Sequence, residues 1–586
     1  MKKNSKKVFI LGAGYGGIQA ALTLQKKKKK SDNIEIYIID KNPFHTLLTE
    51  LHEVAANRID DKGVVVYLKD IFKYTDVNII QDYITKIDFE KQELISEKDN
   101  YAYDYLIMGI GSEPQFYGIE GLEENGLTLW SYKDALKIKD HIISMFDKAA
   151  KEKDPDIRKS YLTFAVVGGG FTGTEMVGEL ALWVKDLAEI YNIDLKEIRL
   201  MLIEALPKIL SIIDDSLISK AVKYLKNKLS VEILTDSPIT KVNKDSFVIN
   251  NKETIKSHTL IWTGGVQANN CLIEFDLEKG KGQRVCVDEY TKTHYENVFA
   301  IGDFALFMTE DNKALPALVE TALETGKYAA KNVLNLVRNK ELEKAEPKLH
   351  GIMVSVGKNY AVADIMGIKM SGLPALFMKH MVNIHYLFGI GGFELIGKYL
   401  KNEFWGVKHK RGIIHRHMDK LSPTFLLVIL RLYLGYMWLM SGIDKINNDW
   451  LKYNMLAGSN ADATTGASIM QLVSEHTPGW YAWIVDTLII PNAMLFQKLV
   501  IITEIGLGLA FITGTFTFLA ALVSIAMNIN FLLSTGLNDL WFLISSIPML
   551  GGAGRAFGVD HYLMPYLMRQ WRHFVRKRKI KINLWK

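Results

Sequence analysis

Two glycine-rich segments, each followed later by an acidic residue, are the part of this sequence best suited to bind a charged cofactor. The segments are GAGYGG and GGGFTG, and their motif glycines are Gly12, Gly14, Gly17, Gly168, Gly170 and Gly173. Glycine lets the backbone approach a pyrophosphate closely, and an acid at the end of the next strand hydrogen-bonds a ribose hydroxyl. Asp40 and Glu204 occupy that position. The pattern predicts two dinucleotide-binding sites.

Each glycine segment needs a strand before it and a helix after it. Residues 7–11 and 161–167 are short β-branched apolar runs, and both glycine segments lead into sequence of helical character. The strands predicted at residues 34–39 and 199–203 end next to the two acids. One such motif is weak evidence, but its repetition predicts two Rossmann-like domains and an α/β fold class.

A third element, Gly302-Asp303, ends a predicted strand at residues 297–301. With it, the sequence resembles the two-dinucleotide-domain flavoprotein reductases. The resemblance implies that the first glycine unit holds FAD, the second holds the nicotinamide cofactor, and Gly302 and Asp303 hold the ribityl and pyrophosphate of the flavin. It also implies an FAD domain in two parts, at 1–118 and 268–340, around a nicotinamide domain at 119–267.

Thiol and metal chemistry are not expected. The only cysteines are Cys271 and Cys286, and no cysteine pair follows Asp40, where the disulfide reductases of this superfamily carry one. Two isolated cysteines also cannot hold an iron–sulfur cluster. Redox chemistry therefore depends on a bound organic cofactor, and no metal site is predicted.

Among these reductases, the sequence resembles the type II NADH dehydrogenases over roughly residues 5–405. The resemblance lies in FHTLLTELHEVAA at 44–56, FTGTE at 171–175 and the stretch 315–326. It implies hydride transfer from NADH to FAD N5 and then two electrons to a membrane quinone, without proton pumping. His45 would lie in the segment under the flavin.

Two glutamates are the candidate catalytic residues. The resemblance places Glu175 near the nicotinamide and the flavin, where it would orient the carboxamide or relay protons. The alternative is an acid in the first turn of a helix, stabilised by the helix dipole. Glu320 stands where the family usually has glutamine, and we expect it to hydrogen-bond a quinone carbonyl when protonated or through water. Glu204 favours NADH, because a carboxylate repels the 2′-phosphate of NADPH.

Residues 341–420 are predicted to be a membrane-proximal, quinone-side region. Apolar and aromatic residues mix with basic ones there, as in a helix that lies in a membrane interface, and a buried helix pair is the alternative. His385 is expected to be a hydrogen-bonded core histidine.

Residues 421–586 are predicted to form a four-helix transmembrane domain with a basic tail. Between residues 493 and 553 the only charged side chains are Lys498, Glu504 and Asp539. The predicted spans are 423–442, 494–513, 516–535 and roughly 540–557. This region resembles the DoxX family over about residues 421–565. Arg431 and Glu504 fall inside spans, and we expect them to form an ion pair.

Basic residues at both ends of this domain favour a cytoplasmic location for both ends. The predicted protein is thus a multi-pass protein of the inner (cytoplasmic) membrane with its catalytic domain on the cytoplasmic side. Its partners would be NADH, a membrane quinone and the lipid bilayer, with a homodimer as a candidate assembly. The net charge of +6 is concentrated in the tail, so nucleic acid is not an expected partner.

Two alternatives to the quinone reductase remain open at this stage. The flavoprotein would be a redox regulator or sensor coupled to the DoxX-like membrane domain, or an NADH-dependent reductase with a different acceptor.

Overall fold

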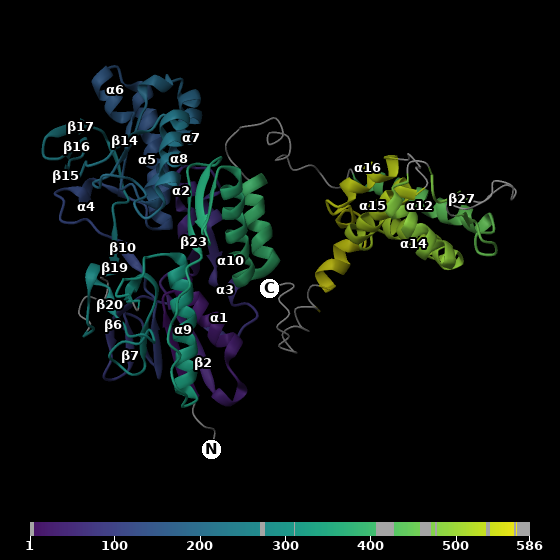
Figure 1. Cartoon of the computed structure of the whole chain (residues 1–586), viewed down its shortest axis with the longest axis horizontal. Coiled ribbons are helices and arrows are strands. Elements are labelled where there is room, and N and C mark those ends of the chain that lie inside the picture. The colour runs from purple at the N-terminus through teal and green to yellow at the C-terminus, as the bar shows by residue number, and fades with distance from the viewer. Residues whose placement is uncertain are drawn as a thin grey trace. The chain divides into compact units, whose positions relative to one another are not determined.

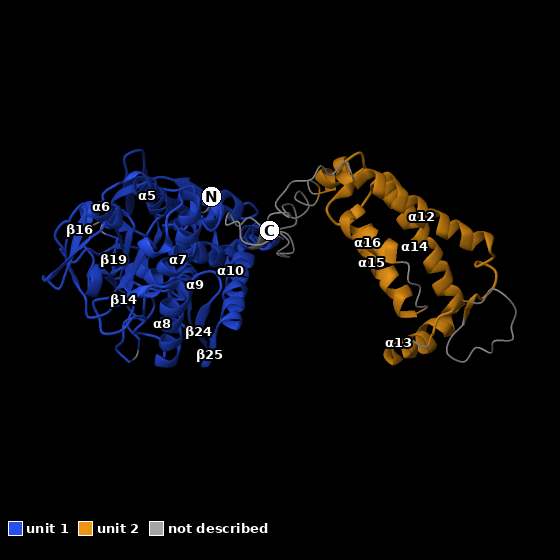
Figure 2. Cartoon of the chain, turned by 90° about the horizontal axis from the view of Figure 1, so that it is seen from above, with its two compact units in different colours: residues 1–419, 582–586 blue, residues 420–581 orange. Residues whose placement is uncertain are grey.

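The chain folds into two compact units, which Figure 2 distinguishes by colour. This computed structural model describes residues 5–269, 276–309, 311–405, 427–457, 470–474, 477–534, 540–567 and 570. The first unit comprises residues 1–419 with 582–586, and the second comprises residues 420–581. Sheets covered by helices form the first unit, whereas the second is mostly helical (Figure 1).

The first sheet of the larger unit has five parallel strands in the order β21-β9-β1-β2-β5. Their bounds are Val298–Ala300, Tyr105–Met108, Lys6–Leu11, Ile34–Asp40 and Val77–Gln81. Val8 and Ile10 of β1 are fully buried. Such continuous burial is typical of a parallel strand with both faces covered, and it explains the uninterrupted apolar run in the sequence.

The second sheet repeats this architecture with the order β11-β18-β12-β13-β14. The strands span Leu127–Thr128, Thr259–Trp262, Thr163–Val167, Arg199–Ile203 and Glu232–Leu234, and all their pairings are parallel. Each sheet is accompanied by a three-stranded antiparallel sheet, formed by β6 (Ile84–Asp88), β7 (Glu93–Ser96) and β8 (Asn100–Ala102), and by β15 (Ile239–Val242), β16 (Ser246–Ile249) and β17 (Glu253–Lys256). The predicted fold class, two Rossmann-like domains, is confirmed.

The second sheet is formed by a segment inserted into the first domain. Strand β10 (Ser112–Pro114) leaves the first domain and pairs antiparallel with β19 (Val266–Ala268), which returns from the second. The chain then completes the first sheet with β21. The residue boundaries assigned to the domains stay predictions.

Helix α9 (Val319–Val337) packs closely against α1 (Tyr15–Lys27), the helix after the first glycine segment. A Cβ on Gly326 of α9 would overlap the carbonyl oxygen of Gly16. A Cβ on Gly16 would lie 3.0 Å from the carbonyl oxygen of Ala322. The two helices can approach this closely only because glycine stands at the crossing.

Helix α10 (Leu373–Leu400) follows the antiparallel sheet β23-β24-β25 (Gly351–Ser355, Ala361–Ile365, Ile368–Ser371). Before a kink at Gly392, one face of α10 exposes large apolar side chains: Leu373, Phe377, Met381 and Phe388. The opposite face buries Lys379 and Leu387. An exposed apolar face differs from a buried helix pair, and His385 is itself exposed, so the expectation of a core histidine is wrong.

Within the described part of the second unit, three helices are long and apolar enough to cross a membrane. They span Leu427–Asn447 (α12), Gly479–Thr513, which ends with α14 (Ala493–Thr513), and Thr517–Ser534 (α15). The expected fourth span is shorter than predicted, because α16 covers only Leu540–Met549. Ten residues rise about 15 Å, half the thickness of the hydrocarbon. Pro548 and the glycines that follow end the helix early.

The expected ion pair between Arg431 and Glu504 is wrong. Arg431 donates to the carbonyl oxygens of Ala553, Ala556 and Phe557 at 2.8 to 3.0 Å. Glu504 instead pairs with Lys445, at 2.8 Å between Nζ and Oε1. Arg431 and Lys445 are both on α12 but lie about 21 Å apart along its axis, so Glu504 can pair with one of them and not with both.

We expect Gly326→Ala to destabilise the protein by about 1–3 kcal/mol, because the added methyl group overlaps the backbone of α1. The matched control is Gly397→Ala on α10, where nothing lies within 4 Å of the new Cβ. That control should be neutral or stabilising by up to about 1 kcal/mol. Unfolding midpoints followed by circular dichroism measure both, and equal midpoints for the two variants would contradict the close crossing.

Candidate active site

The loop before α1 is shaped to hold a phosphate group. Gly12 has φ +101°, and a Cβ on Gly12 or Gly17 would overlap neighbouring backbone oxygens, so the fold itself needs these two glycines. Around Gly14, by contrast, nothing lies within 4 Å of an added Cβ. Gly14 is also the N-cap of α1 and gives no side-chain cap to the free N–H groups of the first turn. Open space and unpaired donors together fit a pyrophosphate.

The loop before α7 (Phe171–Tyr191) has the same design. Gly168 has φ +106°, a Cβ on Gly173 would overlap the carbonyl oxygen of Gly168, and nothing lies within 4 Å of a Cβ on Gly170. Gly170 is the N-cap of α7 and again offers no side-chain cap. Some other helices of this unit do have a side-chain cap, such as α5 (Tyr132–Lys151), which Ser131 caps. The residues therefore fit a second pyrophosphate.

The two acids after the glycine segments hold these loops in place. Asp40 accepts hydrogen bonds from the backbone N–H of Ala13 at 2.8 Å and of Asn42 at 2.7 Å. Glu204 accepts from the N–H of Gly169 at 2.5 Å and of Leu206 at 2.8 Å. A carboxylate oxygen has a further lone pair for a ribose hydroxyl, and that role stays a prediction.

His45 links the first glycine loop to α10. Its Nδ1 lies 3.1 Å from the carbonyl oxygen of Ala13, which only accepts, so Nδ1 carries the hydrogen. Its Nε2 then accepts from the hydroxyl of Tyr386 at 3.0 Å. Burial lowers the pKa of His45 to about 4, so the ring is neutral at physiological pH. The histidine thus fixes the loop without adding charge.

The Gly302-Asp303 segment lies against α9, beside the first glycine loop. Gly302 has φ +64° and donates its N–H to Thr325 Oγ1 at 3.0 Å. Asp303 accepts from Ser112 Oγ at 2.8 Å, and burial raises the pKa of this carboxyl group. Because Gly16 also packs on α9, the structure brings this segment and the first glycine loop together.

Glu175 lies in the second turn of α7 and accepts hydrogen bonds from Ser355. The N–H and the Oγ of Ser355 lie 3.1 and 3.0 Å from Glu175 Oε1. No acid occupies the first turn of α7, so the helix-dipole alternative does not hold. Burial raises the pKa of Glu175 to about 7, while 16% of its side chain remains exposed. This carboxyl group can take up or release a proton near neutral pH.

Glu175 borders a set of buried ionisable residues that the sequence analysis did not identify. We call it the buried charge cluster, and its members are Glu50, His52, Glu53, Arg58, Glu175, Glu179, Lys379 and Glu403. Lys379 lies 2.8 Å from Glu53 and 3.2 Å from Glu50. Arg58 contacts Glu53, and lies 3.2 Å from Glu179 and 2.8 Å from Glu403.

Five carboxyl groups face only two permanent cations in this cluster. Burial lowers the pKa of His52 far below its ordinary value, so this ring adds no positive charge. Burial raises the pKa of both Glu175 and Glu179. Glu175, with its pKa of about 7, therefore stays partly protonated near neutral pH. Three of its carboxylates approach one another within 4.8 Å, as metal ligands do, but Lys379 and Arg58 already neutralise them, and we assign no metal there.

The structure does not bring Glu320 to Glu175. Glu320, in the first turn of α9, accepts the N–H of His350 at 2.9 Å and also contacts the ring of His350. Glu175 contacts Ser355, at the other end of β23. Five residues of strand separate these two contacts by roughly 16 Å. The quinone-side role of Glu320 stays a prediction.

The sequence carried a signal for the missed residues. Lys379 stands within the apolar run of α10, and Glu53 lies in the middle of an apolar helix, α2 (Leu51–Ala55). A charged residue flanked by apolar neighbours on the buried face of a helix needs a partner of opposite charge. Which partner it finds depends on residues hundreds of positions away, such as Arg58 with Glu403.

Two parallel sheets, the second inserted into the domain of the first, two uncapped glycine loops and a Gly-Asp segment beside the first loop define a two-dinucleotide-domain flavoprotein oxidoreductase. Residues 6–326 match the pyridine nucleotide-disulphide oxidoreductase family, and residues 425–584 match a family described as the TQO small subunit DoxD. The chain is 30% identical over 402 residues to the type II NADH:quinone oxidoreductases of Staphylococcus aureus and Staphylococcus saprophyticus. That alignment covers 68% of this chain and 99% of each relative.

Solved structures share the fold of the larger unit. NDH2 from Plasmodium falciparum in complex with NADH aligns with a TM-score of 0.61 and 19% identity, over 69% of this chain and 99% of that one. The sulfide:quinone oxidoreductase of Aquifex aeolicus aligns with a TM-score of 0.55 and 16% identity, over 71% and 96%. The chain belongs to the type II NADH:quinone oxidoreductase family, and it binds FAD and NADH.

We expect Gly14→Val and Gly170→Val to separate the two cofactor sites. Both side chains enter space that the protein leaves open, so both variants should fold. Gly14→Val should purify without flavin absorbance, because the valine occupies the place of the FAD pyrophosphate. Gly170→Val should keep its flavin and lose reduction by NADH, as followed by anaerobic bleaching. Retention of flavin by Gly14→Val would contradict the assignment of the first loop.

We expect Glu175 to contribute less and less to stability as pH rises from 4.5 to 7. In this window the folded chain holds a proton on Glu175 that the unfolded chain has already released, so rising pH favours unfolding. Glu175→Gln removes this contribution. The denaturation midpoint at pH 8, relative to that at pH 5, should therefore be higher in the variant than in the wild type. An identical difference in both proteins would show that Glu175 titrates at an ordinary value.

Proposed function

We propose that this chain oxidises NADH through bound FAD and passes two electrons to a quinone of the membrane. The observation that carries the proposal is the pair of uncapped helix ends with open space at Gly14 and Gly170. The flavin, when bound, supplies the acceptor for the hydride of the nicotinamide. The residues of this chain then have to bind and orient both ring systems and deliver protons.

Protons for the quinone would come through Glu175. Reduction of a quinone to a quinol consumes two protons, and Glu175 is a carboxyl group with its pKa near 7 that is still partly exposed. Lys379 stabilises the charged form of Glu175 electrostatically, and Ser355 donates hydrogen bonds to it. A group with a pKa near the working pH is the most effective proton donor.

The membrane location is supported by two separate features. The three apolar helices of the second unit are each long enough to span a bilayer. The exposed apolar face of α10 in the first unit suits the interface between headgroups and acyl chains. We propose the inner (cytoplasmic) membrane with the flavoprotein unit in the cytoplasm. The basic residues that support this orientation lie outside the described part of the chain.

NADH is the proposed donor rather than NADPH. Glu204 ends strand β13 beside the second glycine loop, where its charge repels a 2′-phosphate. The nearest basic residue, Lys208, pairs with Asp215 at 2.7 Å, which neutralises much of its charge. A homodimer remains a prediction that light scattering of the detergent-solubilised protein would test.

We expect steady-state NADH oxidation to be faster with quinone analogues than with oxygen or ferricyanide as the acceptor, and slower with NADPH as the donor. The measurement is absorbance at the nicotinamide band with a panel of acceptors. Because nothing in hydride transfer moves ions across a membrane, reconstituted vesicles should develop no proton gradient. Turnover with oxygen alone would favour the different-acceptor alternative.

Truncation after residue 420 separates the quinone reductase from the redox regulator. The relatives match over 402 residues, which is 99% of their own length, and the first unit alone, residues 1–419 with 582–586, is longer than that, so this unit should retain NADH oxidation with a water-soluble quinone analogue. If the truncated chain binds FAD and NADH but reduces no quinone, the regulator of the membrane domain becomes the better account.

A further inference from the structure

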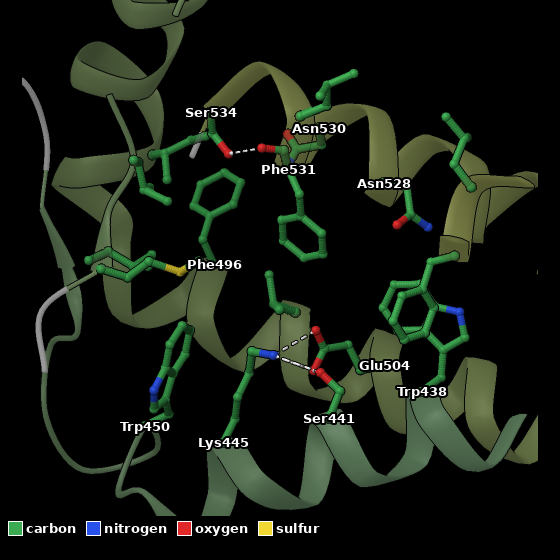
Figure 3. Close-up of a pocket in the computed structure, with 18 of the residues that line it drawn as sticks. Trp438, Ser441, Lys445, Trp450, Phe496, Glu504, Asn528, Asn530, Phe531 and Ser534 are labelled. Carbon is green, nitrogen blue, oxygen red and sulfur yellow. Dashed lines mark hydrogen bonds and ion pairs between the residues drawn. The ribbon is translucent and has the colours of Figure 1, made fainter. Parts of the chain in front are cut away.

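The second unit contains a cavity of about 290 Å³ among α12, α14, α15 and α16 (Figure 3). This volume lies near the lower end of the range for small-molecule sites. Aromatic rings make up much of the wall, from Trp438, Trp450, Phe496, Phe531 and Phe542. Such a lining favours a flat, aromatic occupant over a flexible one. All the lining residues belong to the second unit, so the cavity is separate from the flavoprotein site.

One side of the cavity carries an ion pair. Lys445 Nζ lies 2.8 and 2.9 Å from the two carboxylate oxygens of Glu504 and 3.0 Å from Ser441 Oγ. Glu504 is 1% exposed. Burying ionisable residues inside a membrane span costs free energy, and those that occur there are usually paired with one another or serve a function. The two charges cancel, so the cavity attracts neither an anion nor a cation. Lys445 can donate to a ligand oxygen in place of Ser441 Oγ while its ion pair with Glu504 stays intact.

The other side of the cavity carries an amide. Figure 3 shows Asn530 opposite Lys445, Glu504 and Ser441, with the rings of Phe496 and Phe531 between these polar groups. The side-chain oxygen of Asn530 accepts from the hydroxyl of Tyr481. Its Nδ2 donates to no other described residue. The cavity is thus lined by polar side chains at two opposite sides, Lys445 with Glu504 and the exposed Asn530, with aromatic rings between them.

We propose that this cavity binds a neutral quinone ring, with one carbonyl oxygen at Lys445 and the other at Asn530. A para-quinone has two opposed acceptors on a flat ring and reaches such a cavity through the lipid. Apolar side chains cover the outside of the surrounding helices, such as Ile502, which is 66% exposed. The choice of a quinone over another neutral aromatic compound rests on the proposed function. This would be a second quinone site, in addition to the acceptor site of the flavoprotein unit.

Photolabelling of the full-length protein in detergent tests the proposal. The probe is an azido-substituted 1,4-naphthoquinone, and labelled peptides are mapped by mass spectrometry. We expect labelling within residues 427–457 and 493–534. Val500→Phe places a ring into the cavity and should reduce this labelling at least fivefold. The matched control, Ile502→Phe on the outer face of the same helix, should label like the wild type.

A second variant shows whether reduced labelling reflects a blocked cavity or a misfolded protein. Asn530→Asp keeps the acceptor for Tyr481 and removes the Nδ2 donor, so labelling should again fall while the unfolding midpoint stays close to that of the wild type. Equal labelling of Val500→Phe and wild type overturns the proposal, as does equal labelling by an azidoalkane without a ring. Flavin bleaching by NADH in the same preparation tests the proposed function separately, because it does not depend on the second unit.

Discussion

Helices α1 and α7 begin with backbone N–H groups that no side chain caps, beside open space at Gly14 and Gly170. An orphan donor inside a protein costs free energy unless a partner satisfies it. At α1 and α7 the partner has to fit into the open space beside Gly14 or Gly170. A negative charge is favoured there by the helix dipole. The shape of both loops depends on the other motif glycines, at which a Cβ would overlap the backbone. Asp40 and Glu204 hold the loops by hydrogen bonds to their backbone N–H groups.

The cost of burying polar groups also governs the buried charge cluster. There the ionisable groups are paired, but the acids outnumber the bases. In a medium of low dielectric such an excess cannot stay fully ionised, so part of it is held as neutral carboxylic acid. Glu175 lies at the edge of this cluster, where solvent or substrate can reach it. Burial thus raises the pKa of Glu175, and its partial exposure lets this carboxyl group exchange the proton it holds.

The fold was predictable because its signals are local. A strand, a glycine turn and a helix are contiguous in sequence, so repetition of the unit was visible without any structure. The pairing of ionisable groups is not local. Glu504 meets Lys445 rather than Arg431, and Arg58 meets Glu403 from across the chain, because packing decides which side chains face each other. Helix ends were equally uncertain, as α16 shows, since one proline and a few glycines shorten a span.

Arg431 shows what a short helix requires in an apolar environment. Where α16 ends, the backbone turns through Ala553–Arg555 and leaves carbonyl oxygens without intrahelical partners. Water would solvate such oxygens at the surface of a soluble protein, but hydrocarbon cannot. The guanidinium of Arg431 binds three of them and so replaces the missing solvent. Its planar fork lets one side chain from α12 bind three carbonyl oxygens of the turn that follows α16.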